Sequence, residues 1–133
     1  MEWKFIKELK SKDSIKKFED IIGMELPKDY IEFIEKYNGA RPKLKLFKTI
    51  TGKEHVIKTF LSFNITDIEN IFSVNEWLKK DFNSEYFAIA SDPAGNYIVY
   101  NKKFEIYFWN HEINKFELIT KTFTDFINML YEE

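Results

Sequence analysis

The chain has 133 residues, of which 44% are hydrophobic and 32% charged, so it is long enough to bury a core and too apolar for a disordered protein. It contains no cysteine, which excludes disulfides, thiolate nucleophiles and zinc sites built on cysteine. A net charge of −2 and a single arginine, Arg41, argue against a nucleic-acid-binding protein.

Residues 1–9 predict either a short helix or an extended arm, whose apolar side chains cap a core. This N-terminus lacks the long apolar run of a signal peptide or a membrane span. No linker, low-complexity tract or repeat follows it. We therefore expect a single domain over residues 1–133, located in the cytoplasm.

Two helices with clear start and stop signals come next. The first is predicted over Asp13–Ile22, with Asp13 as its N-cap and Gly23 as its end. The second is predicted over Pro27–Tyr37, because proline suits the first helical position and Asn38-Gly39 supplies a left-handed residue to end it. One face of this second helix carries the expected core residues Tyr30, Phe33, Ile34 and Tyr37.

The middle of the chain predicts a hairpin and a third helix. Residues 43–51 and 55–63 are predicted strands on either side of a turn at Thr51–Glu54. Thr66 and Glu69 have the spacing of a capping box, which predicts a helix starting there. Its expected apolar face consists of Ile68, Ile71, Phe72 and Leu78.

The last third of the chain predicts an antiparallel meander and a closing helix. Strands are predicted over 86–90, 97–100, 104–109 and 116–120, and short loops join them. Thr122 starts the final helix, which presents Phe123, Phe126, Ile127 and Leu130 on one face. The predicted fold is therefore α+β, with N-terminal helices and a C-terminal helix packed on an antiparallel sheet of about six strands.

Motifs for catalysis or metal binding are incomplete. His111-Glu112 begins like a zinc-protease helix, but Lys115 occupies the position of the second histidine. Ser91 lacks the flanking glycines of a nucleophile elbow, and Asp92–Asn96 lacks the ligands of a calcium loop. There is no glycine-rich phosphate loop. We expect no enzyme, no catalytic residue, no metal and no cofactor.

The strand at 104–109 carries aromatic or aliphatic side chains on both of its faces. One face should belong to the core. The other is either covered by a helix or left for a partner, since exposed aromatics beside acidic residues suit a protein-binding surface.

Three sequence blocks occur in order: FEDIIGMELPKDYIEFIEKYNG at 18–39, IASDPAGNYI at 89–98 followed by YFWNHE at 107–112, and TFTDFI at 122–127. Together they resemble the SUKH superfamily, which contains the Smi/Knr-type fungal cell-wall regulators and many bacterial relatives. The chain departs from the family pattern at Pro93-Ala94, where glycines are usual, and at Asn110, where aspartate is usual.

The resemblance implies a non-enzymatic binding domain. Small bacterial members look like immunity proteins, which bind and neutralise a cognate polymorphic toxin, often a nuclease. The implied partner is that toxin protein, with no direct contact to nucleic acid or membrane, and the chain is expected to be a monomer or weak dimer. The predicted partner contacts are Asp92, Asn96, Trp109 and Glu112, where carboxylates mimic phosphate and the tryptophan is an anchor.

The sequence also fits two other functions. The chain is either a regulatory or scaffold adaptor like the fungal relatives, with several weak partners, or an undetected enzyme or ligand binder that uses Asp92 and His111.

Overall fold

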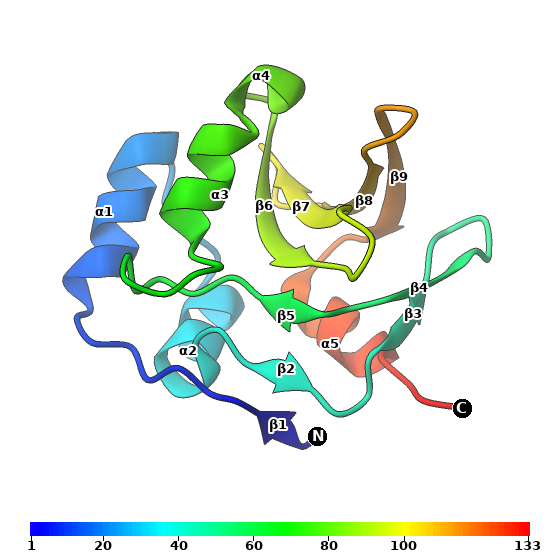
Figure 1. Ribbon diagram of the computed structural model, residues 1–133, viewed down its shortest axis with the longest axis horizontal. Coiled ribbons are helices and arrows are strands. Elements are labelled where there is room, and N and C mark those ends of the chain that lie inside the picture. Colours follow the sequence, from blue (N-terminus) through cyan, green and yellow to red (C-terminus); the bar gives the residue numbers. More distant parts are fainter.

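A five-stranded antiparallel sheet forms the centre of the computed structural model, which describes residues 1–133 (Figure 1). In spatial order its strands are β5 (Thr59–Phe60), β6 (Tyr86–Ser91), β7 (Tyr97–Asn101), β8 (Ile106–Asn110) and β9 (Lys115–Thr120). Two smaller antiparallel pairs join β1 (Trp3–Lys4) to β2 (Arg41–Pro42) and β3 (Leu46–Lys48) to β4 (Glu54–Val56). The predicted α+β class is confirmed, and the main sheet has five strands because the β3–β4 hairpin pairs separately.

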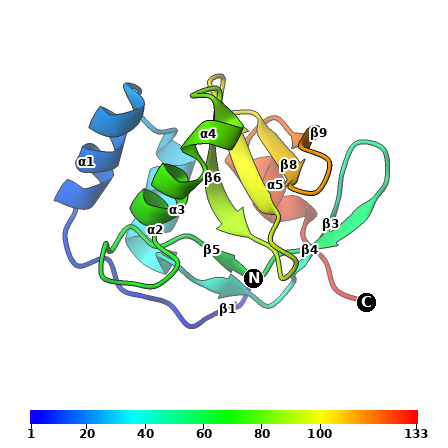
Figure 2. The ribbon, with the colours of Figure 1, turned by 45° about the horizontal axis from the view of Figure 1, so that its top comes forward.

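Five helices surround the sheet: α1 (Asp13–Ile22), α2 (Lys28–Tyr37), α3 (Ile71–Trp77), α4 (Lys79–Phe82) and α5 (Phe123–Met129). Figures 1 and 2 show α1 and α3 on the β6 side of the sheet, with α5 behind the strands. The amide of Asn75 on α3 caps the edge of β6: its Oδ1 accepts from the Ala88 N–H (2.7 Å) and its Nδ2 donates to the Ala88 carbonyl (3.0 Å). None of the helices is long and apolar enough to cross a bilayer.

The first two helices form where the sequence predicts them. Residues before α1 are an extended arm containing β1, which settles the choice between arm and helix. Gly23 ends α1 in the left-handed conformation (φ 73°), and Gly39 does the same after α2 (φ 64°). At the helix starts, Lys12 rather than Asp13 occupies the N-cap, and Pro27 lies one residue before the first helical position.

The capping box predicted at Thr66–Glu69 is wrong. The helix begins at Ile71 instead, because Asn70 takes the N-cap position and its side chain accepts a hydrogen bond from the Ser73 N–H (2.8 Å). Asp67, which lies inside the expected helix, accepts a hydrogen bond from the Ser62 hydroxyl (2.6 Å). Ile68, an expected core residue, is 96% exposed.

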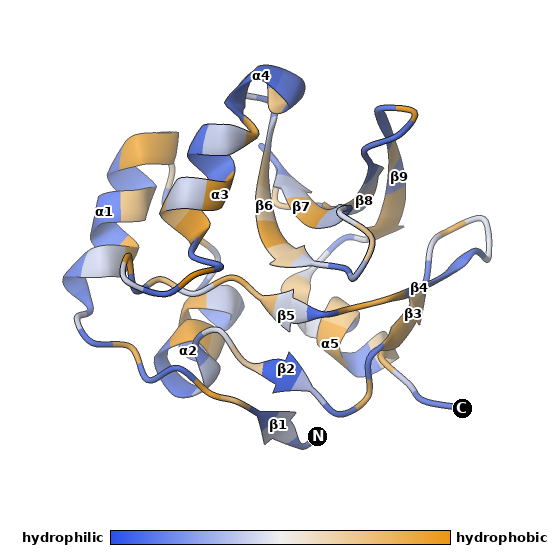
Figure 3. Ribbon diagram, in the orientation of Figure 1, coloured by the Kyte–Doolittle hydropathy of each residue, from blue (hydrophilic) through white to orange (hydrophobic).

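The hydrophobic core lies between one face of the sheet and helices α2 and α5. Tyr30 packs on Phe123 with ring centroids 5.0 Å apart, and Phe33 packs on Phe60 at 4.8 Å. Apolar colouring therefore follows the sheet strands and the interior sides of these helices, whereas β2 is hydrophilic (Figure 3). We call this side of the sheet the inner face.

Candidate protein-binding face

The turn between β6 and β7 is held by one carboxylate. Asp92 Oδ1 accepts hydrogen bonds from the N–H groups of Ala94 (2.9 Å) and Asn96 (2.8 Å), and its Oδ2 accepts one from the Asn96 side-chain amide (3.0 Å). Asp92 is only 9% exposed. A short polar side chain that satisfies the turn's own backbone is typical of tight turns, so this carboxylate stabilises the turn from inside.

The loop between β8 and β9 is clamped to that turn. Asn96 Oδ1 accepts a hydrogen bond from the His111 N–H (2.9 Å), and the His111 ring donates from Nε2 to the Ala94 carbonyl (3.0 Å). The His111 ring also lies against Gly95, where an added Cβ would come within 3.3 Å of Nε2. The two connections therefore form one rigid end of the sheet.

Trp109 fills the space beneath this end. Its indole N–H donates to Asn114 Oδ1 (2.8 Å), which fixes the β8–β9 loop from the other side. Its ring meets Phe82 of α4 edge-on, with ring centroids 5.0 Å apart. Only 4% of Trp109 is exposed, so it supports the loop rather than projecting from it.

The face of the sheet opposite the core carries a second layer of aromatic side chains. We call this layer the outer aromatic face and define it as the half-buried residues Tyr86, Tyr97, Tyr107, Phe116 and Leu118. The register places Tyr97 opposite Trp109, Trp109 opposite Phe116, and Tyr107 opposite Leu118, so these side chains share one side of the sheet.

This face is concave. Tyr86 on β6 stacks on Phe116 of β9 with ring centroids 3.8 Å apart, although β7 and β8 lie between the two strands. A flat sheet would separate them by about 14 Å, since neighbouring strands lie roughly 4.8 Å apart. The sheet therefore curls until rings from its distant strands meet, and Phe82 of α4 packs on Phe116 with ring centroids 5.9 Å apart.

The hydroxyls of Tyr86 and Tyr97 on this face stay available as neutral hydrogen-bonding groups. Partial burial and the neighbouring Tyr107 and Glu85 raise the pKa of Tyr86, and burial with the charges of Glu69 and Asp92 raises the pKa of Tyr97. Among the tyrosines of the chain, only Tyr131 uses its hydroxyl in a hydrogen bond within the protein. A half-buried ring with an unused hydroxyl is the side chain that protein interfaces favour.

A polar cluster adjoins the β5 side of the sheet. Burial opposes ionisation of Glu69, but hydrogen bonds from Lys58 Nζ (2.6 Å) and Ser91 Oγ (2.8 Å) outweigh it and lower its pKa. The Ser91 hydroxyl therefore donates to a carboxylate and is not poised beside a histidine. No group of three or more histidine, aspartate or glutamate side chains is arranged to hold a metal ion.

The structure brings the four sequence-predicted contacts together at one end of the sheet. Asp92 bonds Asn96, Asn96 bonds the β8–β9 loop, and Trp109 lies below that loop. Glu112 is the exposed member of the set. A direct role of these residues in binding a partner stays a prediction.

Sequence reasoning missed most of the outer aromatic face. The aromatic alternation in the strand around Tyr107 indicated a second apolar surface, but the corresponding residues Tyr86, Tyr97 and Phe116 were not singled out. Their meeting depends on the curl of the sheet, which period-two alternation does not encode.

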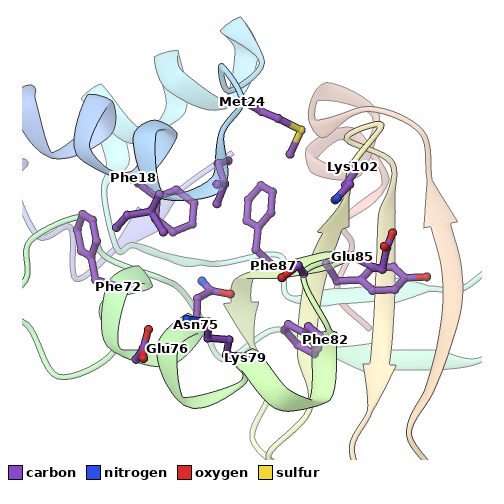
Figure 4. A pocket seen from close by; sticks show the side chains of 14 residues that line it. Phe18, Met24, Phe72, Asn75, Glu76, Lys79, Phe82, Glu85, Phe87 and Lys102 are labelled. Atoms are coloured by element: carbon purple, nitrogen blue, oxygen red, sulfur yellow. The ribbon is translucent and has the colours of Figure 1, made fainter.

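A separate pocket of about 320 Å³ opens between the end of α1, helices α3 and α4, and the start of β6 (Figure 4). Phe18, Phe72 and Phe87 make its walls apolar, and its charged lining residues are Glu76, Lys79, Glu85 and Lys102. The Asn75 amide in the pocket is already bonded to the backbone of Ile71 and Ala88. A ligand site needs convergent unpaired polar groups, so this pocket is the weaker candidate.

Comparison with known proteins gives one finding. A family model described as SMI1 / KNR4 family (SUKH-1) matches residues 10–129. No curated protein matches the chain.

Proposed function

Because the chain belongs to the SMI1/KNR4 family (SUKH-1), as its sequence blocks predicted, we propose that it is an immunity protein for a bacterial polymorphic toxin. The family is typical of such immunity proteins and consists generally of non-catalytic immunity or adaptor proteins. In this proposal the chain acts as a single domain over residues 1–133. It neutralises a cognate toxin of the nuclease class by binding it.

The outer aromatic face is the observation that carries this proposal. Its tyrosines are half-buried, lie on a rigid sheet and leave their hydroxyls unused within the chain. Tyrosine anchors on a preorganised surface lose little conformational entropy when a partner binds. The inner face of the same sheet already packs on α2 and α5, so the second apolar face is the one left to a partner.

Charge favours a basic toxin. The exposed Glu112 lies at the clamped end of the sheet, and Glu85 lies close enough to Tyr86 to affect its titration. Together with the net charge of −2, these carboxylates support electrostatic steering toward a nuclease with a positive surface. Asp92, Asn96 and Trp109 hold the end of the sheet that presents Glu112.

Co-expression with the protein encoded next to this chain's gene tests the proposal. We expect the chain to rescue growth and to be recovered in a complex with that protein. Tyr107→Ala should abolish rescue, whereas Tyr37→Ala, which removes a half-buried tyrosine from α2, should retain it. No rescue and no complex with the unmodified chain would refute the proposal.

The adaptor alternative predicts a different binding pattern. A regulatory or scaffold protein of the Smi/Knr type would bind several unrelated proteins with micromolar dissociation constants. An immunity protein should bind one neighbouring gene product far more tightly. Titration of the purified chain against both kinds of partner separates the two.

A further inference from the structure

The β1–β2 pair forms a ribbon beside β5, which is the edge strand of the main sheet opposite β9. It continues outward from β5, because the Phe60 N–H donates to the Ala40 carbonyl just before β2 (3.0 Å). Figure 1 shows this ribbon beside the N-terminus, away from the curled strands β6–β9. We define the basic ribbon as Lys4, Phe5, Arg41, Lys43 and Lys45.

Exposed cations gather along this ribbon and the segment that follows it. Burial alternates along β2 and the residues after it: Arg41, Lys43 and Lys45 are exposed, whereas Pro42 is buried. Lys4 lies directly opposite Arg41 in the register. Like charges placed opposite each other in a strand pair are destabilising, so folding alone gives no reason for this arrangement.

Most of these cations lack a partner within the chain. Lys43 pairs with Glu2 at 3.5 Å, and none of the chain's other ion pairs uses Lys4, Arg41 or Lys45. The Arg41 charge does contribute, as the weakest of several causes, to the pKa of Glu69. Its guanidinium nevertheless makes no hydrogen bond or ion pair, so its N–H groups are free.

Phe5 adds an exposed apolar group in a strained backbone conformation. Its φ of 55° lies in the left-handed region, which is unfavourable for a bulky side chain. Phe5 is nevertheless 69% exposed, and the Arg41 guanidinium lies over its ring at 5.4 Å from the centroid. The next residue, Ile6, is 47% exposed. Strain that exposes a hydrophobic ring instead of burying it points to a role outside the fold.

We propose that the basic ribbon binds an acidic segment of a second protein, one that carries carboxylates next to an apolar side chain. The Arg41 guanidinium lies over the Phe5 ring with its N–H groups unpaired, and a guanidinium suits two-point recognition of a carboxylate. Phe5 and Ile6 supply the apolar contact. This surface is separate from the outer aromatic face, so it serves a partner other than the toxin.

A nucleic-acid partner fits this surface less well. Single-stranded nucleic acids bind by stacking successive bases on aromatic rings, whereas Phe5 is the one aromatic residue of the basic ribbon and the exposed residue next to it, Ile6, is aliphatic.

The partner class is tested with three fluorescein-labelled probes of equal charge at low salt. They are a glutamate peptide interrupted by leucines, the same peptide with glycines for the leucines, and oligothymidylate. We expect the leucine peptide to bind most tightly by fluorescence anisotropy, about ten-fold tighter than the glycine peptide. Equal or tighter binding of oligothymidylate, or no binding of the leucine peptide, would overturn the proposal.

Variants locate the binding to the ribbon. Phe5→Gly relieves the strain of the left-handed conformation, so it should leave stability unchanged or higher. It should also weaken binding of the leucine peptide roughly ten-fold. Arg41→Gln should weaken it similarly, whereas Lys17→Gln, which removes an exposed unpaired cation from α1, should not. If Lys17→Gln weakened binding of the leucine peptide equally, the binding would be non-specific electrostatic attraction, which would contradict a site on the ribbon. Rescue from the toxin should survive Phe5→Gly, so failure of one proposal does not imply failure of the other.

Discussion

The two faces of the main sheet carry the same kinds of side chain but bury them to different extents. On the inner face, Tyr100 and Phe108 are buried beneath α2, α5 and the β3–β4 hairpin. On the outer face, Tyr86, Tyr107 and Phe116 are half-buried, and Phe82 from α4 packs on Phe116.

The core and the candidate binding face differ in how deeply their side chains are buried, and not in the types of side chain that they contain. An antiparallel sheet usually has one apolar face and one polar face. Here both faces are apolar, but several rings on the outer face stay half-buried. We therefore place the partner on the outer face, and mutations on the two faces should separate effects on stability from effects on binding.

The largest effect is expected from a core aromatic. Phe126 is fully buried and its ring lies 5.5 Å from that of Phe47. Phe126→Ala should lower the free energy of unfolding by about 3–5 kcal/mol, because it leaves a cavity. Tyr107→Ala on the outer face should lower it by less than about 2 kcal/mol, since the residue is half-buried. Urea unfolding measures the free energy of unfolding of both variants. Equal decreases would show that the two faces contribute equally to stability, which would contradict the proposed difference.

A smaller effect is expected at the clamped end of the outer face. Asp92→Ala removes three hydrogen bonds from the β6–β7 turn. It should cost about 1–3 kcal/mol of unfolding free energy, because two backbone N–H groups lose their acceptor. Asp20→Ala, which removes an exposed carboxylate paired with Lys16 on α1, should cost less than about 0.5 kcal/mol. Chemical-shift changes caused by Asp92→Ala should extend to His111. Changes confined to the β6–β7 turn would contradict its attachment to the β8–β9 loop.

Removing a single tyrosine hydroxyl from each face should affect stability and binding differently. The Tyr100 hydroxyl is buried without a hydrogen-bond partner, and burial raises its pKa. Tyr100→Phe should therefore leave stability unchanged or raise it by up to about 1 kcal/mol. Tyr107→Phe should leave thermal stability unchanged but weaken the toxin complex. A clear loss of stability in Tyr100→Phe would mean that its hydroxyl is satisfied in solution.

The smallest effect concerns pH. The folded protein lowers the pKa of Glu69 below its ordinary value of 4.5, so ionised Glu69 stabilises the fold. That contribution is complete above the ordinary value and is lost as pH falls through the lowered pKa. Urea midpoints measured from about pH 7 to about pH 3 should fall less steeply in Glu69→Gln. An unchanged slope would show that the Lys58 and Ser91 contacts do not favour the charged form.

Local signals made much of the fold predictable. Gly23 and Gly39 end helices where their left-handed conformations are needed, and Thr122 caps α5 by accepting from the Asp125 N–H at 3.1 Å. The Asp92 turn likewise forms from bonds within five residues. Interactions this close in sequence can be inferred from residue types alone.

Other features could not be predicted, because they depend on competition between helix caps or on contacts between residues distant in sequence. Asn70 displaced the capping box at Thr66, because two plausible caps lay within one turn of each other. Trp109 looked like a candidate anchor, but Phe82 covers it from a helix 27 positions earlier in the chain. The outer aromatic face depends on the curl of the sheet, so its residues could not be grouped from the sequence.

NMR cross-saturation of the complex with the neighbouring gene product locates the toxin-binding surface. We predict saturation transfer to Tyr107, Phe116 and the residues around Glu112, with none at the β1–β2 ribbon. Transfer confined to Ile21 and the pocket beside α3, or to the ribbon, would contradict the assignment of the outer aromatic face as the toxin-binding surface.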